Sequence, residues 1–457
     1  MLFTLTIITV SIIFLSMLSG SIISFIENER KAAIRFFISG IVLSLIFFIP
    51  AFFPWYIPNE ITTGINILFY GFLLVLFFPR PFTKRKEGIV PREKIDERDT
   101  MFSRDLLEQN TENFNTYYSR NPERKLKDDK FRKNPGILKE GTLFYDKHIF
   151  NAAEANFDII TNNRAFVTGP IEKTTKKLEP KSTSPFIKQL AKKYGAINVG
   201  ITKLKTEHLY SYRGRSHNYG EKVENTHQFA IALTVEMDHD LVRNAPYALS
   251  VLESSRQYVR SGMIALRIAQ YIRRLGYDAR AHIDGEYEVI CPLVARDAGL
   301  GEIGRMGLLM TPEIGPRVRI AVVTTSIPLI PDKRTEDFSM IDFCKTCKKC
   351  AEVCPSKAIP FEDRKEIYGV LRWQIDQEAC FTYWTKAGTD CARCMSVCPY
   401  SHPNNFLHSI VRYGIKNSPV FRKIAVKMDD FFYGRKPKPL KLPKWYKSEK
   451  SDSESET

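Results

Sequence analysis

Eight of the nine cysteines lie between residues 344 and 398, in two runs that each end in Cys-Pro. The first run reads C-x2-C-x2-C-x3-C-P from residue 344, and the second reads C-x10-C-x2-C-x3-C-P from residue 380. In bacterial ferredoxins, three thiolates of the first spacing hold one [4Fe–4S] cube and the fourth binds the other cube. The spacing therefore predicts two [4Fe–4S] clusters and a redox protein. The expected ligand sets are Cys344, Cys347, Cys350 and Cys398 for one cluster, and Cys354, Cys380, Cys391 and Cys394 for the other.

Zinc and disulfide bonds are the alternative uses of these cysteines. Structural zinc sites commonly pair two C-x2-C knuckles across a longer loop, whereas three cysteines here recur at every third position. Tight CxxC runs also suit metal better than disulfide bonds, and a reducing cytosol would keep them as thiols. The long gap before Cys391 departs from the ferredoxin pattern, so Cys380 is the ligand that the spacing supports least. The ninth cysteine, Cys291, lies in an apolar run and is expected to be a small buried side chain.

The beginning of the chain contains three uncharged apolar segments, at residues 1–26, 36–58 and 61–79. A helix needs about 20 apolar residues to cross a bilayer. These segments are too long and too numerous for a cleaved signal peptide, and no twin-arginine pair opens the chain. We therefore expect residues 1–80 to form a membrane anchor of three transmembrane helices.

Basic residues near these segments predict the orientation of the anchor. Lys and Arg occur at positions 30–35 and again at positions 80–86, but the loop between the second and third segments contains neither. The positive-inside rule then places the remaining chain in the cytoplasm, as part of a multi-pass inner-membrane protein. The net charge of +16 also invites a nucleic-acid interpretation. Much of the excess lies beside the anchor and in the tail at residues 404–457, where anionic lipid is the better partner, so no nucleic acid is expected.

The rest of the chain divides by composition. Residues 81–181 are polar and charged, as in a linker with a loose wrap over a core. Residues 182–340 show the pattern of an α/β domain that can bury a core of normal size. Strands are expected at 196–201, 229–237, 287–293 and 318–325, and a long helix at 246–275, capped by Gly276. A ferredoxin-like cluster domain follows at residues 341–403, and the acidic end of the basic tail is expected to be disordered.

Five segments in one order resemble the reductive dehalogenases, which are corrinoid, iron–sulfur enzymes that remove halogen from organohalides. The segments are LGYDARAH (275–282), AGLGEIGRMG (298–307), GPRVRI (315–320), FCKTCKKCAEVCP (343–355) and CFTYWTKAGTDCARCMSVCPYSHP (380–403). The resemblance covers roughly residues 218–403 and implies a nitroreductase-like α/β core that binds cobalamin in its base-off form. The apolar beginning is similar to the small membrane anchor that accompanies many members, here fused to the catalytic chain.

The resemblance also implies a tyrosine that protonates the carbon losing halide, beside a cation that stabilises the tyrosinate. Tyr258 is the first choice for this acid and Tyr247 the second, although either could simply pack on a helix face. Arg317 and then Arg305 are the candidates for the cation, with ion pairing to nearby carboxylates as the alternative role.

Glycine-rich stretches and aromatic residues are the candidates for holding the corrinoid and the substrate. Glycines permit close approach of the backbone to a large ring, but they could equally serve turns. Trp384, with Trp373 and Tyr383, could wall an apolar pocket or pack around the clusters. The residues expected to bind the cofactor are Gly299, Gly301, Gly304, Gly315 and Trp384.

The implied function is a membrane-anchored reductive dehalogenase. Electrons from a low-potential donor, such as a ferredoxin, a flavoprotein or a quinol-linked protein, would pass through the two clusters to cobalamin, which removes halide from an organohalide. An enzyme similar to epoxyqueuosine reductase is one alternative, and the membrane anchor counts against it. An electron-transfer subunit without catalysis is another, and the domain at residues 182–340 counts against that, because a relay needs no such body.

Overall fold

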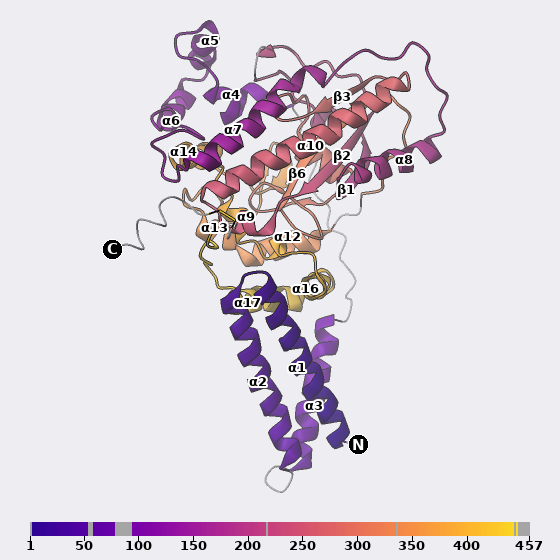
Figure 1. Ribbon diagram of the computed structural model, residues 1–457, viewed down its shortest axis with the longest axis vertical. Coiled ribbons are helices and arrows are strands. Elements are labelled where there is room, and N and C mark those ends of the chain that lie inside the picture. The colour runs from indigo at the N-terminus through magenta and orange to yellow at the C-terminus, as the bar shows by residue number, and fades with distance from the viewer. Residues whose placement is uncertain are drawn as a thin grey trace. The chain divides into compact units, whose positions relative to one another are not determined.

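The computed structural model describes most of the chain, and Figure 1 shows its elements. The described residues are 2–53, 58–77, 94–215, 218–334, 337–442 and 445–446. The basic positions 80–86 and the acidic end of the tail, on which two of the predictions above rest, lie outside them. The chain forms two compact units, each assembled from distant segments. One comprises Met1–Arg85, Phe338–Cys347 and His402–Leu440, and the other Lys86–Asp337, Lys348–Ser401 and Lys441–Thr457.

A four-stranded antiparallel sheet forms the centre of the second unit. Its strand order is β1-β2-β6-β3, with β1 at Asn198–Lys203, β2 at Phe229–Glu236, β6 at Val318–Thr325 and β3 at Ala279–His282. The runs of Val, Ile, Ala and Thr that form β2 and β6 are typical of strands buried on both faces. The expected mixed α/β core is confirmed, and the structure adds that every pairing in this sheet is antiparallel.

Alternating side chains of β2 enter two different cores. Ile231, Leu233 and Val235 pack on the face covered by helices α8 (Pro180–Lys193) and α10 (Ala248–Arg274). Ala230 and Ala232 pack on the opposite face against α11 (Cys291–Asp297) and the hairpin of β4 (Glu302–Ile303) and β5 (Leu309–Met310). This period of two is what a strand covered on both faces requires. The sheet is therefore a rigid layer between two apolar cores.

The long helix α10 positions the residue of greatest chemical interest, Tyr258. It ends where Gly276 adopts a φ of +83°, and the Gly276 N–H donates to the Arg273 carbonyl at 3.0 Å. A left-handed glycine after the last turn is the common C-terminal cap of a helix, so the predicted cap is confirmed. The helices and strands of this unit not yet placed are α4 (Met101–Asp105), α5 (Glu112–Arg120), α6 (Pro122–Arg132), α7 (Lys147–Asn162), α9 (His239–Arg243), α13 (Lys349–Val353), α14 (Gln377–Ala387), α15 (Arg393–Ser396), β7 (Lys365–Ile367) and β8 (Val370–Arg372).

The strand predicted at residues 287–293 is wrong. Val289 makes only an isolated bridge to Leu209, and α11 begins at Cys291 with Pro292 in its first turn. Proline is favoured there because the first helical positions need no backbone donor. The fourth strand of the sheet is instead β3, which pairs with the edge of β6 not bound by β2, and the hydrophobic pattern did not reveal it because Arg280 and His282 interrupt it. Cys291 is buried, as expected of a small apolar side chain.

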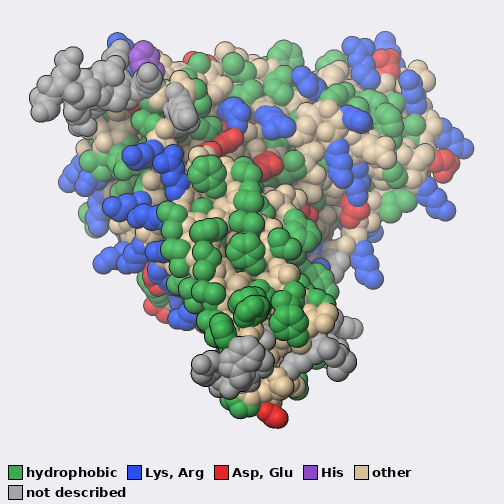
Figure 2. Space-filling view, turned by 60° about the horizontal axis from the view of Figure 1, so that its bottom comes forward, with side chains coloured by type: hydrophobic (Ala, Val, Ile, Leu, Met, Phe, Trp, Pro, Cys, Tyr) green, Lys and Arg blue, Asp and Glu red, His purple; other side chains and the backbone are tan. Residues whose placement is uncertain are grey.

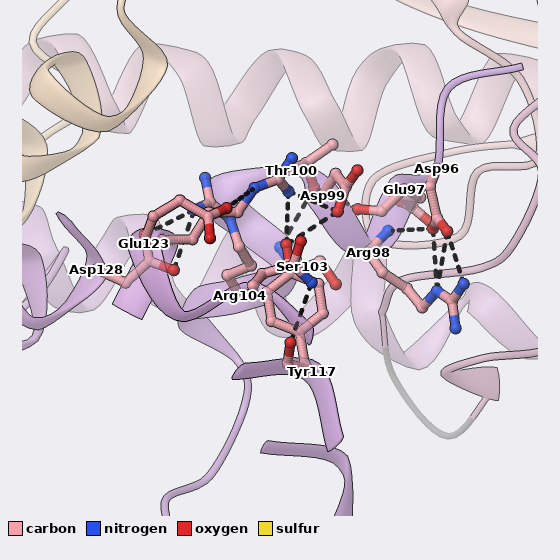
Figure 3. Close-up of polar contacts among 12 residues, drawn as sticks. Asp96, Glu97, Arg98, Asp99, Thr100, Ser103, Arg104, Tyr117, Glu123 and Asp128 are labelled. Atoms are coloured by element: carbon pink, nitrogen blue, oxygen red, sulfur yellow. Dashed lines mark hydrogen bonds and ion pairs between the residues drawn. The ribbon is translucent and has the colours of Figure 1, made fainter. Parts of the chain in front are cut away.

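The segment before the sheet is more ordered than its polar composition suggested. Its helices begin at capping side chains, since Thr100, Thr111 and Asp146 accept from backbone N–H groups in the first turns of α4, α5 and α7. Arg104 and Asp128 form an ion pair at 2.8 Å with side-chain exposures of 1% and 0% (Figure 3). Because such charged residues pair with one another inside the segment, it can be folded although its sequence is polar.

Replacing Arg104 with Met is expected to lower the free energy of unfolding by about 3–5 kcal/mol, the usual cost of breaking a buried pair from one side. The substitution leaves the Asp128 carboxylate buried, with the Tyr118 hydroxyl at 2.7 Å still donating to it. Asp129→Ala is the matched control, because its pair with Lys125 is exposed and should contribute at most about 0.5 kcal/mol. Urea unfolding followed by circular dichroism compares them, and equal losses would contradict the argument.

The described part of the first unit contains helices and no strands. A hairpin of α1 (Leu2–Ile26) and α2 (Arg30–Phe52) packs closely, because Gly20 lies against Phe36 and Gly40 against Met17. Thr9 and Asn66 join α1 to α3 (Asn59–Phe77) through a buried hydrogen bond of 2.9 Å. The other helices of this unit are α12 (Phe338–Cys347), α16 (Phe406–Asn417) and α17 (Pro419–Phe432).

Two helices of this unit, not the expected three, are long and apolar enough to cross a membrane among the described residues. They span Phe3–Ile26 and Arg30–Ile49. The helix α3, which contains most of the third predicted segment, is not one of them. Large apolar side chains of α1 and α2 are exposed rather than buried, and Figure 2 shows hydrophobic side chains gathered over these helices.

Candidate functional site

Four of the predicted cluster ligands converge within the second unit. Cys354 follows α13 and Cys380 lies on α14. Cys391 lies two residues before the short helix α15, and Cys394 lies within it. Cys380, Cys391 and Cys394 each interact electrostatically with Cys354. Cys394 also interacts with Cys380 and Cys391. Cys391 and Ala392 take left-handed backbone angles, with φ of +60° and +47°, which turn the chain sharply between two of the ligands. These four cysteines of one predicted set, including Cys380, are thus neighbours, and Cys350 of the other predicted set is also a neighbour of Cys394.

Burial makes these thiols poor anions unless a cation is present. It raises the pKa of Cys380 and of Cys391 to about 12, and that of Cys394 well above its usual value, and the neighbouring cysteines add to the effect. Four thiolates held this close would repel one another strongly in a medium of low dielectric constant. A polynuclear iron centre removes that cost, because a metal-bound thiol is deprotonated outright. The arrangement therefore fits a metal cluster, which would hold these cysteines as thiolates.

The other four cysteines occur in both units. Cys344 and Cys347 lie one helical turn apart near the end of α12, and both are buried. Cys350 is buried on α13, and Cys398 is buried just before Pro399. Lys348 lies between Cys347 and Cys350 and adopts a φ of +57°. This turn separates the end of α12 from the beginning of α13.

Tyr258, the predicted proton donor, lies beside a cation that the sequence analysis did not select. The guanidinium carbon of Arg319 is 4.6 Å from the centre of the Tyr258 ring. Arg319 is held by Asp390, at 3.0 Å, and by the hydroxyl of Ser254. The same hydroxyl donates to the Asp390 carboxylate. Tyr258, Arg319 and Asp390 come from α10, β6 and the residue directly before Cys391, so the cluster ligand and the tyrosine share one connected group of side chains.

The environment of Tyr258 keeps its proton in place. The Arg319 charge is the largest single influence and lowers its pKa, but burial and the carboxylates of Asp284 and Asp390 outweigh it, so the pKa lies above the ordinary 10.0. The hydroxyl has no hydrogen-bond partner within the described parts of the chain. It is therefore a protonated, unengaged donor with a guanidinium ready to stabilise its anion.

Polar and aromatic groups extend this site along one side. The guanidinium of Arg215 lies 5.5 Å from the Tyr287 ring and 3.1 Å from the Glu97 carboxylate. Burial, Asp284 and Tyr258 raise the pKa of Tyr287 well above its ordinary value. Tyr258, Tyr287, Arg215 and Arg319 all remain partly accessible despite their position within the fold.

Two buried polar atoms beside Tyr258 lack hydrogen-bond partners among the described residues. They are the Asp390 Oδ1 and Arg319 Nε atoms. Leaving such atoms unsatisfied costs about 1–3 kcal/mol each. Their position beside Tyr258 indicates that this site takes a ligand with polar groups of its own.

The two arginines that the sequence analysis favoured serve the protein framework. Arg317 donates to the Ser401 carbonyl at 2.9 Å and pairs with Glu236 at 2.8 Å. Arg305 donates to the Pro360 and Glu362 carbonyls at 2.7 and 2.8 Å. The structure thus brings Tyr258 together with Arg319 and with neither of these. Tyr247, the second choice for the acid, is 44% exposed at the start of α10.

The predicted cofactor glycines have protein neighbours in the structure. A Cβ on Gly301 would collide with the Met310 carbonyl of the β4–β5 hairpin, and one on Gly315 would collide with Tyr400. Gly304 donates to the Leu308 carbonyl at 3.0 Å, and Gly299 has a φ of +80° in the turn after α11. These glycines fulfil the turn and packing roles that the sequence left open. Trp384 lies on α14, partly accessible, with its ring centre 5.8 Å from that of Phe102.

Comparison with known proteins agrees with this site. Residues 343–402, which contain all eight clustered cysteines, match the 4Fe-4S dicluster domain family. The chain is 33% identical over 294 residues to a tetrachloroethene reductive dehalogenase of Sulfurospirillum multivorans, covering 56% of this chain and 58% of that protein. A tetrachloroethene reductive dehalogenase of Desulfitobacterium hafniense is 33% identical over 213 residues, covering 44% and 38%. The chain thus spans little more than half the length of these curated relatives at most.

A solved structure shares the fold over a larger part of the chain. It is a catabolic reductive dehalogenase in complex with 3-bromo-4-hydroxybenzoic acid, 25% identical, with a TM-score of 0.63 over 80% of this chain and 50% of that one. Over its α/β core and cluster region, this chain is therefore similar to reductive dehalogenases in both sequence and fold.

Proposed function

We propose that this protein is a membrane-anchored reductive dehalogenase that uses two [4Fe–4S] clusters and a base-off corrinoid. One observation carries the proposal. Asp390, which binds the arginine beside Tyr258, directly precedes the cluster ligand Cys391. The cluster that would supply electrons and the tyrosine that would supply a proton are therefore linked through Asp390 and Arg319. A protein that only relayed electrons would have no use for a buried, protonated tyrosine at that place.

The residues around Tyr258 fit a corrinoid. A corrin ring carries amide side chains that both donate and accept hydrogen bonds, which matches an orphaned carboxylate oxygen and an orphaned guanidinium nitrogen at Asp390 and Arg319. The partly accessible Tyr258 and Tyr287 rings would lie along the substrate side of the group. When bound, the corrinoid would supply a cobalt centre of low potential for cleavage of the carbon–halogen bond. The chain's own residues would bind it, exclude water and control the proton.

The reaction balances as organohalide plus two electrons and one proton, giving the dehalogenated product and halide. Tyr258 donates the proton to the carbon that loses the halogen, and its phenolate is left beside the Arg319 guanidinium. Asp390 fixes Arg319 in position at 3.0 Å. A fixed positive charge at the place where an anion develops is a strong source of rate acceleration, because no solvent needs to reorganise around it.

The partners follow from this chemistry. The substrate is an organohalide, and a low-potential donor reduces the clusters. The exposed apolar helices α1 and α2 would enter the bilayer, with the α/β unit on the cytoplasmic side, as the basic residues at 30–35 indicate.

Protease added to intact cells should leave the cluster region whole, whereas protease added to opened cells should cut it. Digestion in intact cells would refute the orientation without touching the enzymatic proposal.

The activity is tested by halide release. Membranes that contain the full chain, matured with cobalamin, are supplied with reduced methyl viologen and either tetrachloroethene or 3-bromo-4-hydroxybenzoic acid. Both compounds occur in the names of the similar proteins described above. We expect chloride or bromide release that depends on the protein, together with corrinoid released by cyanide extraction. Absence of extractable corrinoid from cluster-loaded protein, with no halide released from aryl or alkyl halides, would overturn the proposal.

A further inference from the structure

We propose that Glu27, His402 and His408 form a zinc site in the helical unit, separate from the iron–sulfur ligands. One ligand atom from each of the three residues lies within 4.8 Å of the other two. Glu27 and His408 are buried, and the His402 side chain is only 11% exposed. All three belong to the same compact unit, so the arrangement does not depend on how the two units are placed.

The three residues come from segments that the chain brings together over a long distance. Glu27 is the first residue after α1, His402 precedes α16, and His408 lies in the first turn of α16. The His408 Nε2 atom is 3.1 Å from both oxygens of the Glu27 carboxylate. The His402 and His408 rings are stacked, with centres 4.4 Å apart and planes within 8°. Because the lone pair of an imidazole nitrogen lies in the ring plane, one of these parallel rings must turn before both can bind the same ion as the Glu27 carboxylate.

Neighbouring side chains hold these groups as supporting residues hold metal ligands. Asn405 donates to a Glu27 oxygen at 2.7 Å, and its own side-chain oxygen accepts from the His408 backbone N–H at 3.1 Å. The Asp429 carboxylate of α17 lies 3.3 Å from the His402 Nε2 atom. A carboxylate bound to one ring nitrogen fixes the tautomer and leaves the other nitrogen for the metal, as in carboxylate–histidine–zinc triads.

The composition of the cluster favours zinc. Imidazole nitrogen and carboxylate oxygen are among its ordinary ligands, and two histidines with one carboxylate already supply three positions of a tetrahedral site. Glu27 and Asp429 also bring two carboxylates into a buried place, at 7% and 9% exposure. Buried charge is costly unless it is paired or bound to metal. A divalent cation would balance the charge of these two carboxylates.

Such an ion would tie the end of the apolar hairpin to the C-terminal helices. Glu27 lies in the short connection between α1 and α2, while the histidines and Asp429 belong to the segment from His402 to α17. Metal binding to such a site contributes directly to folding, since no comparable site exists in the unfolded chain. The zinc would therefore stabilise the helical unit, and it need not take part in the reaction.

The test uses the full chain, purified without oxygen and with its clusters in place, after equilibration with Zn²⁺ and removal of loosely bound metal. We expect about one zinc per chain, with an X-ray absorption spectrum that shows Zn–N and Zn–O distances of about 2.0–2.1 Å and no Zn–S distance of about 2.3 Å. His408→Ala and Glu27→Gln should lose this zinc and keep their iron. His148→Ala, a control on the exposed surface of α7, should keep both.

Asp429→Asn provides the variant that is least disruptive to folding. Because Asp429 would only orient His402, its substitution should lower zinc affinity about 10–100-fold and leave the iron content unchanged. The proposal is overturned if the wild-type chain holds no zinc, if the bound zinc is coordinated by sulfur, or if His408→Ala and Asp429→Asn bind zinc as the wild type does. In those cases the three residues form a hydrogen-bonded cluster only.

Discussion

Substitution of Tyr258 by Phe is expected to lower the turnover number for halide release by about 10²–10⁴-fold, the usual contribution of a positioned general acid. The substitution removes one oxygen and leaves the ring contacts with Phe157 and Arg319 in place. Iron content and corrinoid content should stay at wild-type levels, because Tyr258 is not proposed to ligate either group. The loss should therefore fall on the proton-transfer step and not on assembly of the enzyme.

Tyr247→Phe is the matched comparison, since this tyrosine is exposed and was the other candidate for the acid. It should leave the rate of halide release nearly unchanged. The raised pKa of Tyr258 means that its proton is retained through neutral pH and beyond pH 10, so the wild-type rate should show no loss from ionisation of this group below that value. A Tyr258→Phe enzyme with the wild-type rate would move the acid elsewhere.

Substitution of Cys380 by Ala is expected to abolish halide release and to lower the iron content from about eight to about four per chain. Cys380 is the ligand that departs from ferredoxin spacing, yet the structure places it among Cys354, Cys391 and Cys394. Removing one of four thiolates opens a cube to solvent and oxygen. In the proposed route electrons cross both clusters to reach the site at Tyr258, so losing one cluster should stop turnover altogether.

Cys291→Ala is the control for this substitution, because Cys291 is buried in the apolar core beneath the sheet and is not near the cluster set. It should retain both clusters and most of its activity. Iron and acid-labile sulfide analysis, with electron paramagnetic resonance after dithionite, distinguishes the two variants. Full iron content in Cys380→Ala would show that another residue supplies the fourth ligand.

The sequence was most informative where chemistry depends on local spacing. Two cysteine runs are enough to specify cluster ligands, because a cube requires thiolates at short, fixed intervals. The structure gathers Cys354, Cys380, Cys391 and Cys394 as that spacing indicated. The long helix and the buried strands β1, β2 and β6 were also visible, since apolar runs and a capping Gly276 mark them locally.

Predictions failed where distant residues decide the outcome. Arg317 and Arg319 are nearly equivalent in sequence, but the Ser401 carbonyl binds the first and Asp390 binds the second. These partners lie about 70–85 positions away along the chain, so no local pattern could choose between the two arginines. A search for an acidic residue next to a cluster cysteine, such as Asp390 before Cys391, is the one signal that could have suggested a paired arginine.

The polar segment before the sheet illustrates a second limit. Its composition predicted a loose wrap, but Arg104, Asp128 and Tyr118 satisfy one another inside it. Composition records charges without their partners, and a buried ion pair counts as two polar residues. Of the three apolar helices that the sequence predicted, two are long and apolar enough to cross a membrane within the described residues.

The most direct test of the account is the electron stoichiometry of the purified full chain. Reduced methyl viologen is mixed with cofactor-loaded protein in the presence and absence of an organohalide, and viologen oxidation and halide are measured together. The account predicts two viologens oxidised for each halide released, and negligible oxidation without the organohalide. Steady viologen oxidation by intact, corrinoid-loaded protein with no halide formed would contradict it.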